Sequence, residues 1–296
     1  MSSIAHSAVQ VTRPTTLDDA LVALADAATS QTPLRLLAGG TDIMVEANHG
    51  GLRYRNFLDL SGLRAELSGL AWNDAGDLRI GAMCTYAKLL GDRRAVAELP
   101  MLADAARLVG ASQIQARGTF AGNVENGSPA ADGAPALLAL DAIVHLRSAR
   151  GARTIPLAEY YTGYRATARK ADELITGLTV PAQRGPTSQQ FFRKVGTRAF
   201  QAITKVGLSA RIVWTKGEIS DARIVATSMA ATICRARHLE NALRGVSTLT
   251  PATIARLRNA QNADLRPLDD VRSTADYRAE VFHRLVLQAV GETHPS

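Results

Sequence analysis

Two glycine-containing segments carry the residue types that bind phosphate groups. The first is a Gly-Gly-Thr triplet at 39–41, between an apolar run at 34–38 and a helical pattern at 43–47. The second, at 118–123, repeats the combination of glycine, threonine and a polar amide. Backbone N–H groups between a strand and a helix point into one concavity, which favours a diphosphate, and the carboxylate of Asp132 has the acceptors that ribose hydroxyls need. Taken singly, each segment also fits a tight turn or a plain surface loop.

Motifs for chemistry on this chain itself are missing from the sequence. It has no HExxH, GxSxG, GxxxxGK[ST] or GxGxxG, and its six histidines form no metal-site pattern. Cys84 and Cys234 are 150 positions apart, with no CxxC and no Cys-His spacing, which argues against a zinc site or a cysteine-held iron-sulfur cluster. We therefore expect no catalytic acid, base or nucleophile and no metal on this chain.

Composition and charge indicate a folded, cytoplasmic protein of two domains. With 296 residues, 46% hydrophobic and 21% charged, the chain has enough apolar side chains for a sizeable core. No apolar stretch reaches the length of a membrane span, and residues 1–15 lack the features of a signal peptide. Residues 1–180 carry 17 basic and 18 acidic side chains, whereas 181–296 carry 17 and 9, which supports a boundary near Pro181. The basic residues are scattered singly, so nucleic acid is not the favoured partner.

The elements that must position the two segments alternate between short strands and helices, which predicts an α+β fold. A helix is expected after Thr16, which has capping-box spacing to Asp19, and the stretch 110–129 is expected to be a long loop. Beyond Pro181 we expect strands and then helices. The strands are predicted at 189–195, 202–214 and 219–229, and the helices at 236–243, 251–260 and 274–290.

Taken together and in order, these segments resemble the FAD-binding subunit or domain of the molybdenum hydroxylase family, which includes xanthine dehydrogenase and the medium subunit of carbon monoxide dehydrogenase. The resemblance spans nearly the whole chain. It rests on LLAGGTDIMVE at 36–46, RGTFAGNVENGSPAADGAPALLALDA at 117–142, DELITGLTVP at 172–181, FFRKVGTRAFQAI at 191–203 and DDVRSTADYR at 269–278.

The resemblance implies a fold and a set of cofactor contacts. It predicts a two-part FAD-binding domain of the vanillyl-alcohol-oxidase/PCMH-like type at 1–180, with subdomains at about 1–58 and 59–180, and a smaller C-terminal α+β domain with an antiparallel sheet at 181–296. Two loops would wrap the FAD diphosphate, and Asp132 would hold the adenosine ribose. The residues implied to contact FAD are Leu36, Leu37, Ala38, Gly39, Gly40, Thr41, Asp42, Ile43, Val109, Thr119, Ala121, Gly122, Asn123, Asn126, Asp132, Ile175, Lys194 and Ile203.

Some of these residues have a plainer interpretation. Leu37, Ile175 and Ile203 also suit a core in any fold, and Lys194 also suits a solvated strand. Arg198 and Lys205 fall in the segment that lies over one flavin face in xanthine dehydrogenases.

The implied activity is that of an electron-transfer subunit of an oxidoreductase. FAD on this chain would take electrons from two [2Fe-2S] clusters of a small partner subunit and pass them to an acceptor such as NAD. A large molybdopterin subunit would hydroxylate the substrate, and the assembly would be a dimer of heterotrimers. The alternatives are a self-contained FAD-dependent oxidase or reductase, a medium subunit of the carbon monoxide dehydrogenase type, and a non-enzymatic protein that binds nucleic acid or an acidic partner.

The sequence departs from the family pattern at three places. Phe120-Ala121 replaces the usual Ile-Gly of the second loop, so one close backbone approach must tolerate a methyl group. Val109 stands where some relatives use an aromatic residue, and Ala202 stands where the carbon monoxide enzymes have a tyrosine. Ala202, together with TDIMVEANHG at 41–50, favours the xanthine-dehydrogenase-like branch over carbon monoxide oxidation.

Overall fold

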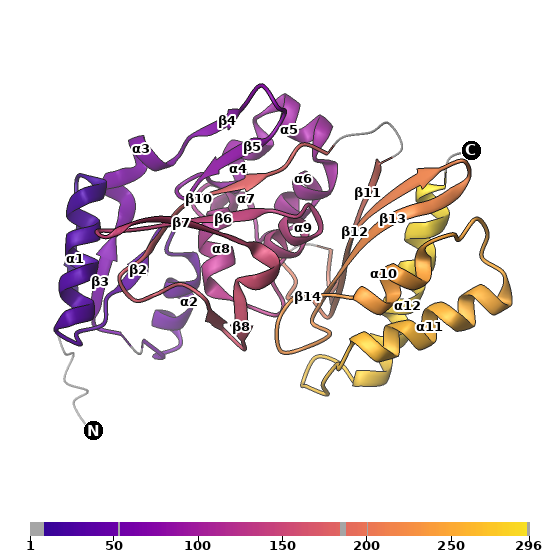
Figure 1. Ribbon diagram of the computed structural model, residues 1–296. Helices are drawn as coiled ribbons and strands as arrows, with labels where there is room; N and C mark the ends of the chain where they lie inside the picture. The colour runs from indigo at the N-terminus through magenta and orange to yellow at the C-terminus, as the bar shows by residue number, and fades with distance from the viewer. Residues whose placement is uncertain (1–8, 53, 184–187, 200, 295–296) are drawn as a thin grey trace.

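The computed structural model describes residues 9–52, 54–183, 188–199 and 201–294. Two larger sheets and a two-stranded hairpin occupy the N-terminal part of the chain, and a third larger sheet with its own helices occupies the C-terminal part (Figure 1). The α+β fold with a C-terminal antiparallel sheet that the sequence predicts is confirmed.

The first sheet has three parallel strands in the order β1-β3-β2. Helix α1 begins after Thr16, whose hydroxyl accepts a hydrogen bond from the backbone N–H of Asp19 as expected for a capping residue. Apolar residues on one side of α1 are buried, while helix α2 follows β2 directly. The elements of this part are β1 (Gln10–Thr12), α1 (Leu17–Thr29), β2 (Arg35–Leu37), α2 (Thr41–Asn48), β3 (Asn56–Asp59), η1 (Leu60–Leu63) and α3 (Arg64–Leu67).

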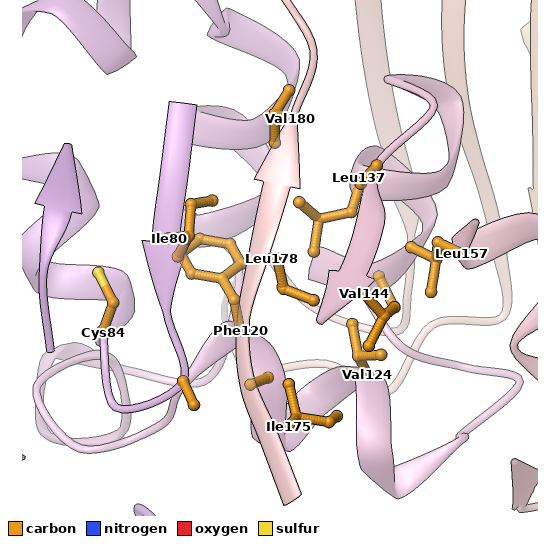
Figure 2. Packing of buried hydrophobic residues seen from close by; sticks show 14 of the residues in the cluster. Ile80, Cys84, Phe120, Val124, Leu137, Val144, Leu157, Ile175, Leu178 and Val180 are labelled. Atoms are coloured by element: carbon orange, nitrogen blue, oxygen red, sulfur yellow. The ribbon is translucent and has the colours of Figure 1, made fainter. Parts of the chain in front are cut away.

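The second sheet has five antiparallel strands in the order β4-β5-β10-β6-β7. Its buried face carries Ile80, Val144 and Leu178, against which Phe120 and Leu137 of two helices pack (Figure 2). The strands are β4 (Leu70–Trp72), β5 (Leu78–Gly81), β6 (Ile143–Ser148), β7 (Gly151–Pro156) and β10 (Leu174–Val180). The helices are α4 (Tyr86–Leu90), α5 (Arg93–Glu98), α6 (Pro100–Arg107), α7 (Ser112–Gln115), α8 (Phe120–Asn126), α9 (Gly133–Ala139) and η2 (Leu157–Glu159), with a small hairpin of β8 (Tyr161–Gly163) and β9 (Ala166–Thr167).

The third sheet is antiparallel, in the order β11-β12-β13-β14, and encloses a second core. Helices α10 and α12 contact one side of it, while α9 and α6 of the N-terminal part contact β12, β13 and β11 (Figure 1). Because helices cover both faces of this sheet, most of β12 is buried. The elements are β11 (Ser188–Val195), β12 (Val206–Thr215), β13 (Glu218–Thr227), β14 (Cys234–Arg235), α10 (Arg237–Leu243), α11 (Pro251–Asp264) and α12 (Ala275–Thr293).

Two sequence expectations about elements are wrong. The stretch 110–129 is not one long loop, because it contains α7 and α8. Helix α8 forms because the Thr119 hydroxyl accepts from the backbone N–H of Gly122, Phe120 and Val124 are buried on one side, and Gly127 ends the helix with a φ of 59°. The strand expected at 202–214 begins only at Val206, since the residues before it belong to the β11–β12 loop.

Candidate functional site

The first glycine segment connects β2 to α2. Gly40 occupies the N-cap position of α2 with a φ of 76°, a conformation that favours glycine. A glycine cap has no side-chain acceptor, and the first N–H groups of a helix have no partner within the helix. Thr41 and Asp42 form the first turn of α2. The start of this eight-residue helix therefore presents backbone donors that an anionic group can accept from.

The second glycine segment surrounds the start of α8. Thr119 is buried, and its hydroxyl oxygen accepts a hydrogen bond from the Gly122 N–H at 3.0 Å, so the side chain caps the helix. The Asn123 side-chain oxygen accepts a hydrogen bond from the Ala134 N–H at 2.9 Å. Ala121, at the position where the family resemblance led us to expect glycine, is buried with 5% of its surface exposed. Its methyl group is thus accommodated by the core rather than directed into the space beside the helix.

The two segments touch each other through their backbones. A Cβ atom at Gly39 would lie 2.1 Å from the carbonyl oxygen of Arg117, and one at Gly118 would lie 3.0 Å from Tyr86 and from the Ile114 oxygen. The Arg117 Nε donates back to the Gly39 carbonyl at 3.3 Å. A side chain at Gly39 would therefore force the two segments apart, whereas one at Gly118 would press on Tyr86 and Ile114. The uncapped start of α2 beside a backbone-to-backbone contact fits a cofactor with a diphosphate.

Asp132 joins the N-terminal part to the third sheet. One carboxylate oxygen accepts from Lys194 Nζ at 2.5 Å and the other from Thr204 Oγ1 at 2.7 Å. The lysine, of which 7% of the side chain is exposed, also donates to the Leu108 carbonyl at 3.2 Å. Burial raises the pKa of Asp132, while Lys194 and Thr204 oppose that rise. Lys194 is therefore a buried partner of Asp132 and not a solvated strand lysine.

The other residues predicted to contact FAD differ in how far their side chains are buried. Leu36, Leu37, Ala38 and Ile43 are half-buried beside the first segment, and Val109 and Asn126 are half-buried near the second. Ile175 is different, because its side chain is buried in the same hydrophobic core as Phe120 and Val124 (Figure 2). Ile203 is also different, since it is 56% exposed in the β11–β12 loop. The core interpretation therefore describes the side chain of Ile175 and does not describe that of Ile203.

Several residues around the segments had no sequence signal. Arg165 lies close enough to Asp42 to oppose the rise in the pKa of this carboxyl that burial causes. The Arg165 guanidinium also donates to the Asn126 side-chain oxygen at 3.3 Å. Glu125 accepts from Tyr160 at 2.6 Å and from Arg169 at 2.7 Å, which ties α8 to the chain after β7. Arg165 and Arg169 lie about 40 positions beyond their partners (39 and 44) and in no motif, so spacing could not reveal them.

The uncapped start of α2 beside the contact between the glycine segments suits an anionic cofactor, and comparison with known proteins identifies the class. The family described as FAD binding domain in molybdopterin dehydrogenase matches residues 7–183, and the CO dehydrogenase flavoprotein C-terminal domain matches residues 191–293. The chain belongs to this family, that of the FAD-binding medium subunits of molybdenum hydroxylases.

Individual relatives span nearly the same length. The xanthine dehydrogenase FAD-binding subunit of Escherichia coli O157:H7 is 29% identical over 280 residues, which is 95% of this chain and 94% of the relative. The nicotine 6-hydroxylase medium subunit of Paenarthrobacter nicotinovorans is 30% identical over 221 residues, covering 74% and 76%. A chain of carbon monoxide dehydrogenase from Hydrogenophaga pseudoflava superposes with a TM-score of 0.88 at 25% identity, covering 97% of this chain and 99% of that one.

Two further findings for the described residues concern metal binding and membrane crossing. Among them, no three His, Cys, Asp or Glu side chains are grouped so that they could hold a metal ion. Within the same ranges, no helix combines the length and apolar character needed to cross a membrane. Cys84 and Cys234 are free thiols, and burial raises the pKa of each to about 11, which makes both poor nucleophiles.

Proposed function

We propose that this chain binds FAD with its diphosphate between the two glycine segments and serves as the electron-transfer subunit of a molybdenum hydroxylase. The observation that carries the proposal is the contact of Gly39 with the Arg117 backbone beside the uncapped start of α2. When bound, FAD accepts electrons and releases them one or two at a time. The chain's own residues bind the cofactor and orient it.

Each part of the proposed site has a distinct task. The backbone donors at 40–43 and 120–121 would hold the diphosphate oxygens, since the N–H groups of Gly122 and Asn123 already donate to Thr119. Asp132, fixed by Lys194 and Thr204, would accept from the adenosine ribose through the remaining lone pairs of its carboxylate. The family resemblance would place Ile203, whose side chain is 56% exposed in the β11–β12 loop, beside the flavin ring.

The rest of the proposal concerns partners and organisation. Electrons would come from two [2Fe-2S] clusters of a small subunit, while a large molybdopterin subunit hydroxylates the substrate, in a cytoplasmic dimer of heterotrimers. The acceptor would be NAD, which the xanthine-dehydrogenase-like motifs favour. We also propose a division into domains at 1–180 and 181–296, supported by two cores. The xanthine-dehydrogenase-like branch is preferred over a self-contained oxidase, because no catalytic acid-base pair is recognised in the sequence.

The first test is the absorbance spectrum of the purified chain, followed by acid release and chromatography of the chromophore. Flavin bands and released FAD are expected, and a colourless chain that does not take up added FAD would refute the proposal. The site itself is tested by Gly40→Ala, with Gly50→Ala as control. Both positions have a left-handed φ, 76° and 69°, so the backbone strain is similar, but only Gly40 lies at the proposed site. Flavin content should fall in Gly40→Ala alone.

A further inference from the structure

Arg278 is a buried arginine in the first turn of α12, far in sequence from both glycine segments. Only 5% of its side chain is exposed. Its Nη1 donates to the backbone carbonyls of Lys205 at 2.9 Å and Ser228 at 3.0 Å, and its Nη2 pairs with the Asp270 carboxylate at 2.7 Å. A buried guanidinium is tolerated only when such partners replace water. The residue is therefore held in a single place by three contacts.

One carbonyl that Arg278 binds lies at the base of the β11–β12 loop. The Lys205 N–H donates to the Val195 carbonyl at 2.9 Å, which closes the loop that contains Ile203. Thr204, the last residue of this loop, donates its hydroxyl to Asp132 at 2.7 Å. Fixing the Lys205 carbonyl thus fixes the residue next to the one that binds Asp132.

The other carbonyl belongs to Ser228, which directly follows β13 in the left-handed conformation, with a φ of 61°. This conformation is unfavourable for a non-glycine residue, so surrounding contacts must hold it. All three polar groups of Ser228 have partners. Its N–H donates to the Pro129 carbonyl and its hydroxyl to the Thr204 carbonyl, both at 2.8 Å, while its own carbonyl accepts from Arg278.

Both paths from Arg278 end on the same short stretch of the N-terminal part. One runs through Lys205 and Thr204 to Asp132, and the other through Ser228 to Pro129. These end points are three residues apart, immediately after α8. Arg278 therefore joins helix α12 to the segment in which the proposed ribose-binding carboxylate lies.

We propose that Arg278 is a positioning residue for the FAD site, acting through Thr204 and Ser228 on the stretch 129–132; this inference rests on the proposed function. The planar fork of arginine reaches two carbonyls and a carboxylate at once, and the single ammonium of lysine does not reproduce that geometry. Arg278 touches no cofactor itself. Its loss should leave the two glycine segments in contact and displace the Thr204 hydroxyl from Asp132.

The test compares FAD dissociation constants of the full-length chain, measured by quenching of flavin fluorescence. Arg278→Met and Arg278→Lys should each weaken binding about tenfold, which corresponds to about 1.4 kcal/mol, because the Thr204 hydroxyl is no longer held on Asp132. The matched control is Arg284→Met. Arg284 lies on the same helix but is 75% exposed, and its Glu280 partner is a surface residue. FAD binding by this variant should equal that of the wild type.

A double-mutant cycle separates positioning from general stabilisation. If Arg278 acts through Thr204, then Thr204→Val should weaken FAD binding less in the Arg278→Met background than in the wild type. Additive effects, accompanied only by a lower Tm, would show that Arg278 merely stabilises the fold and would overturn the inference. Hydrogen exchange of the amides at 203–206 without FAD should speed up in Arg278→Met and not in Arg284→Met.

The outcomes distinguish the inference from the function it rests on. A wild-type chain that binds no FAD overturns both. A wild-type chain that binds FAD, with unchanged affinity in Arg278→Met, overturns the positioning role alone. Should Arg278→Met not fold, Asp270→Asn decides, because Asp270 is 39% exposed and its change removes the negative charge beside Arg278 while leaving both carbonyl contacts. Binding about threefold weaker supports the role, and unchanged binding overturns it.

Discussion

Replacing Gly39 by alanine tests the contact between the glycine segments most directly. The added Cβ would lie 2.1 Å from the carbonyl oxygen of Arg117, 2.7 Å from its carbonyl carbon and 3.0 Å from the Gly118 Cα. Ordinary contacts between such atoms are about 3.5 Å, so the two backbones must separate by more than about 1 Å. No flexible side chain is involved that could move away instead.

The size of the effect follows from the cost of that separation. Forcing extra volume into a packed site costs about 1–3 kcal/mol, and the urea midpoint should fall accordingly. If FAD needs both segments in their present places, binding must also restore the contact, which weakens its affinity roughly fivefold to 150-fold. FAD affinity is measured by fluorescence titration on the same preparation that is used for urea unfolding.

Gly69→Ala is the control for this experiment. A Cβ at Gly69 meets no atom within 4 Å, and the position is away from both segments. This variant should bind FAD like the wild type, with unchanged or slightly higher stability. If Gly39→Ala also bound FAD with wild-type affinity, the assignment of the diphosphate to the meeting point of the two segments would be refuted.

Three further changes test the electrostatics. Lys194→Met should destabilise the chain by about 3–5 kcal/mol in urea unfolding, because it leaves the buried Asp132 carboxylate without its cation. Adding Asp132→Asn should recover part of this loss, and no recovery would show that the two side chains are not coupled. Desolvation lowers the pKa of His145 to about 4. The folded state thus favours the neutral imidazole, and the free energy of unfolding should fall as the pH drops from about 6.5 towards 4. The fall should be on the order of 1 kcal/mol at pH 5 after screening by solvent, and it should be smaller in His145→Gln. His283 is buried with no hydrogen-bond partner for either ring nitrogen among the described residues, so His283→Leu should raise the Tm by several degrees, and a lower Tm would contradict this.

The sequence predicted the elements that are specified locally. Thr16 and Asp19 have the spacing of a helix cap, and the Gly-Gly-Thr triplet at 39–41 interrupts apolar runs where the chain passes from β2 to α2. The same reasoning missed α8, since its seven residues are too few to show a helical period. It also gave β10 no strand assignment, because a strand buried in the middle of a sheet shows an apolar run rather than an alternation.

The glycine segments could be found from the sequence for the same reason. Glycine, threonine and a following helix are consecutive features, so their chemistry is visible without a fold. The partners of Asp132 were not visible as such, because Lys194 and Thr204 are 62 and 72 positions away and meet it only when the third sheet packs on α9. Arg278 was part of a motif, but its contacts with Lys205 and Ser228 span 73 and 50 positions.

The basic excess of residues 181–296 has a structural explanation in part. Asp141 belongs to the N-terminal part and directly follows α9. Its carboxylate forms ion pairs with Arg223 at 3.0 Å, Arg235 at 3.2 Å and Arg211 at 3.7 Å. All three guanidiniums come from the third sheet, and each has less than a quarter of its side chain exposed. Lys194 repeats the pattern on Asp132. Basic side chains of the third sheet therefore pair with acidic side chains of the N-terminal part, and these pairs fix how the third sheet packs on α9. Because these pairs are partly buried, salt should weaken this contact less than it weakens surface pairs.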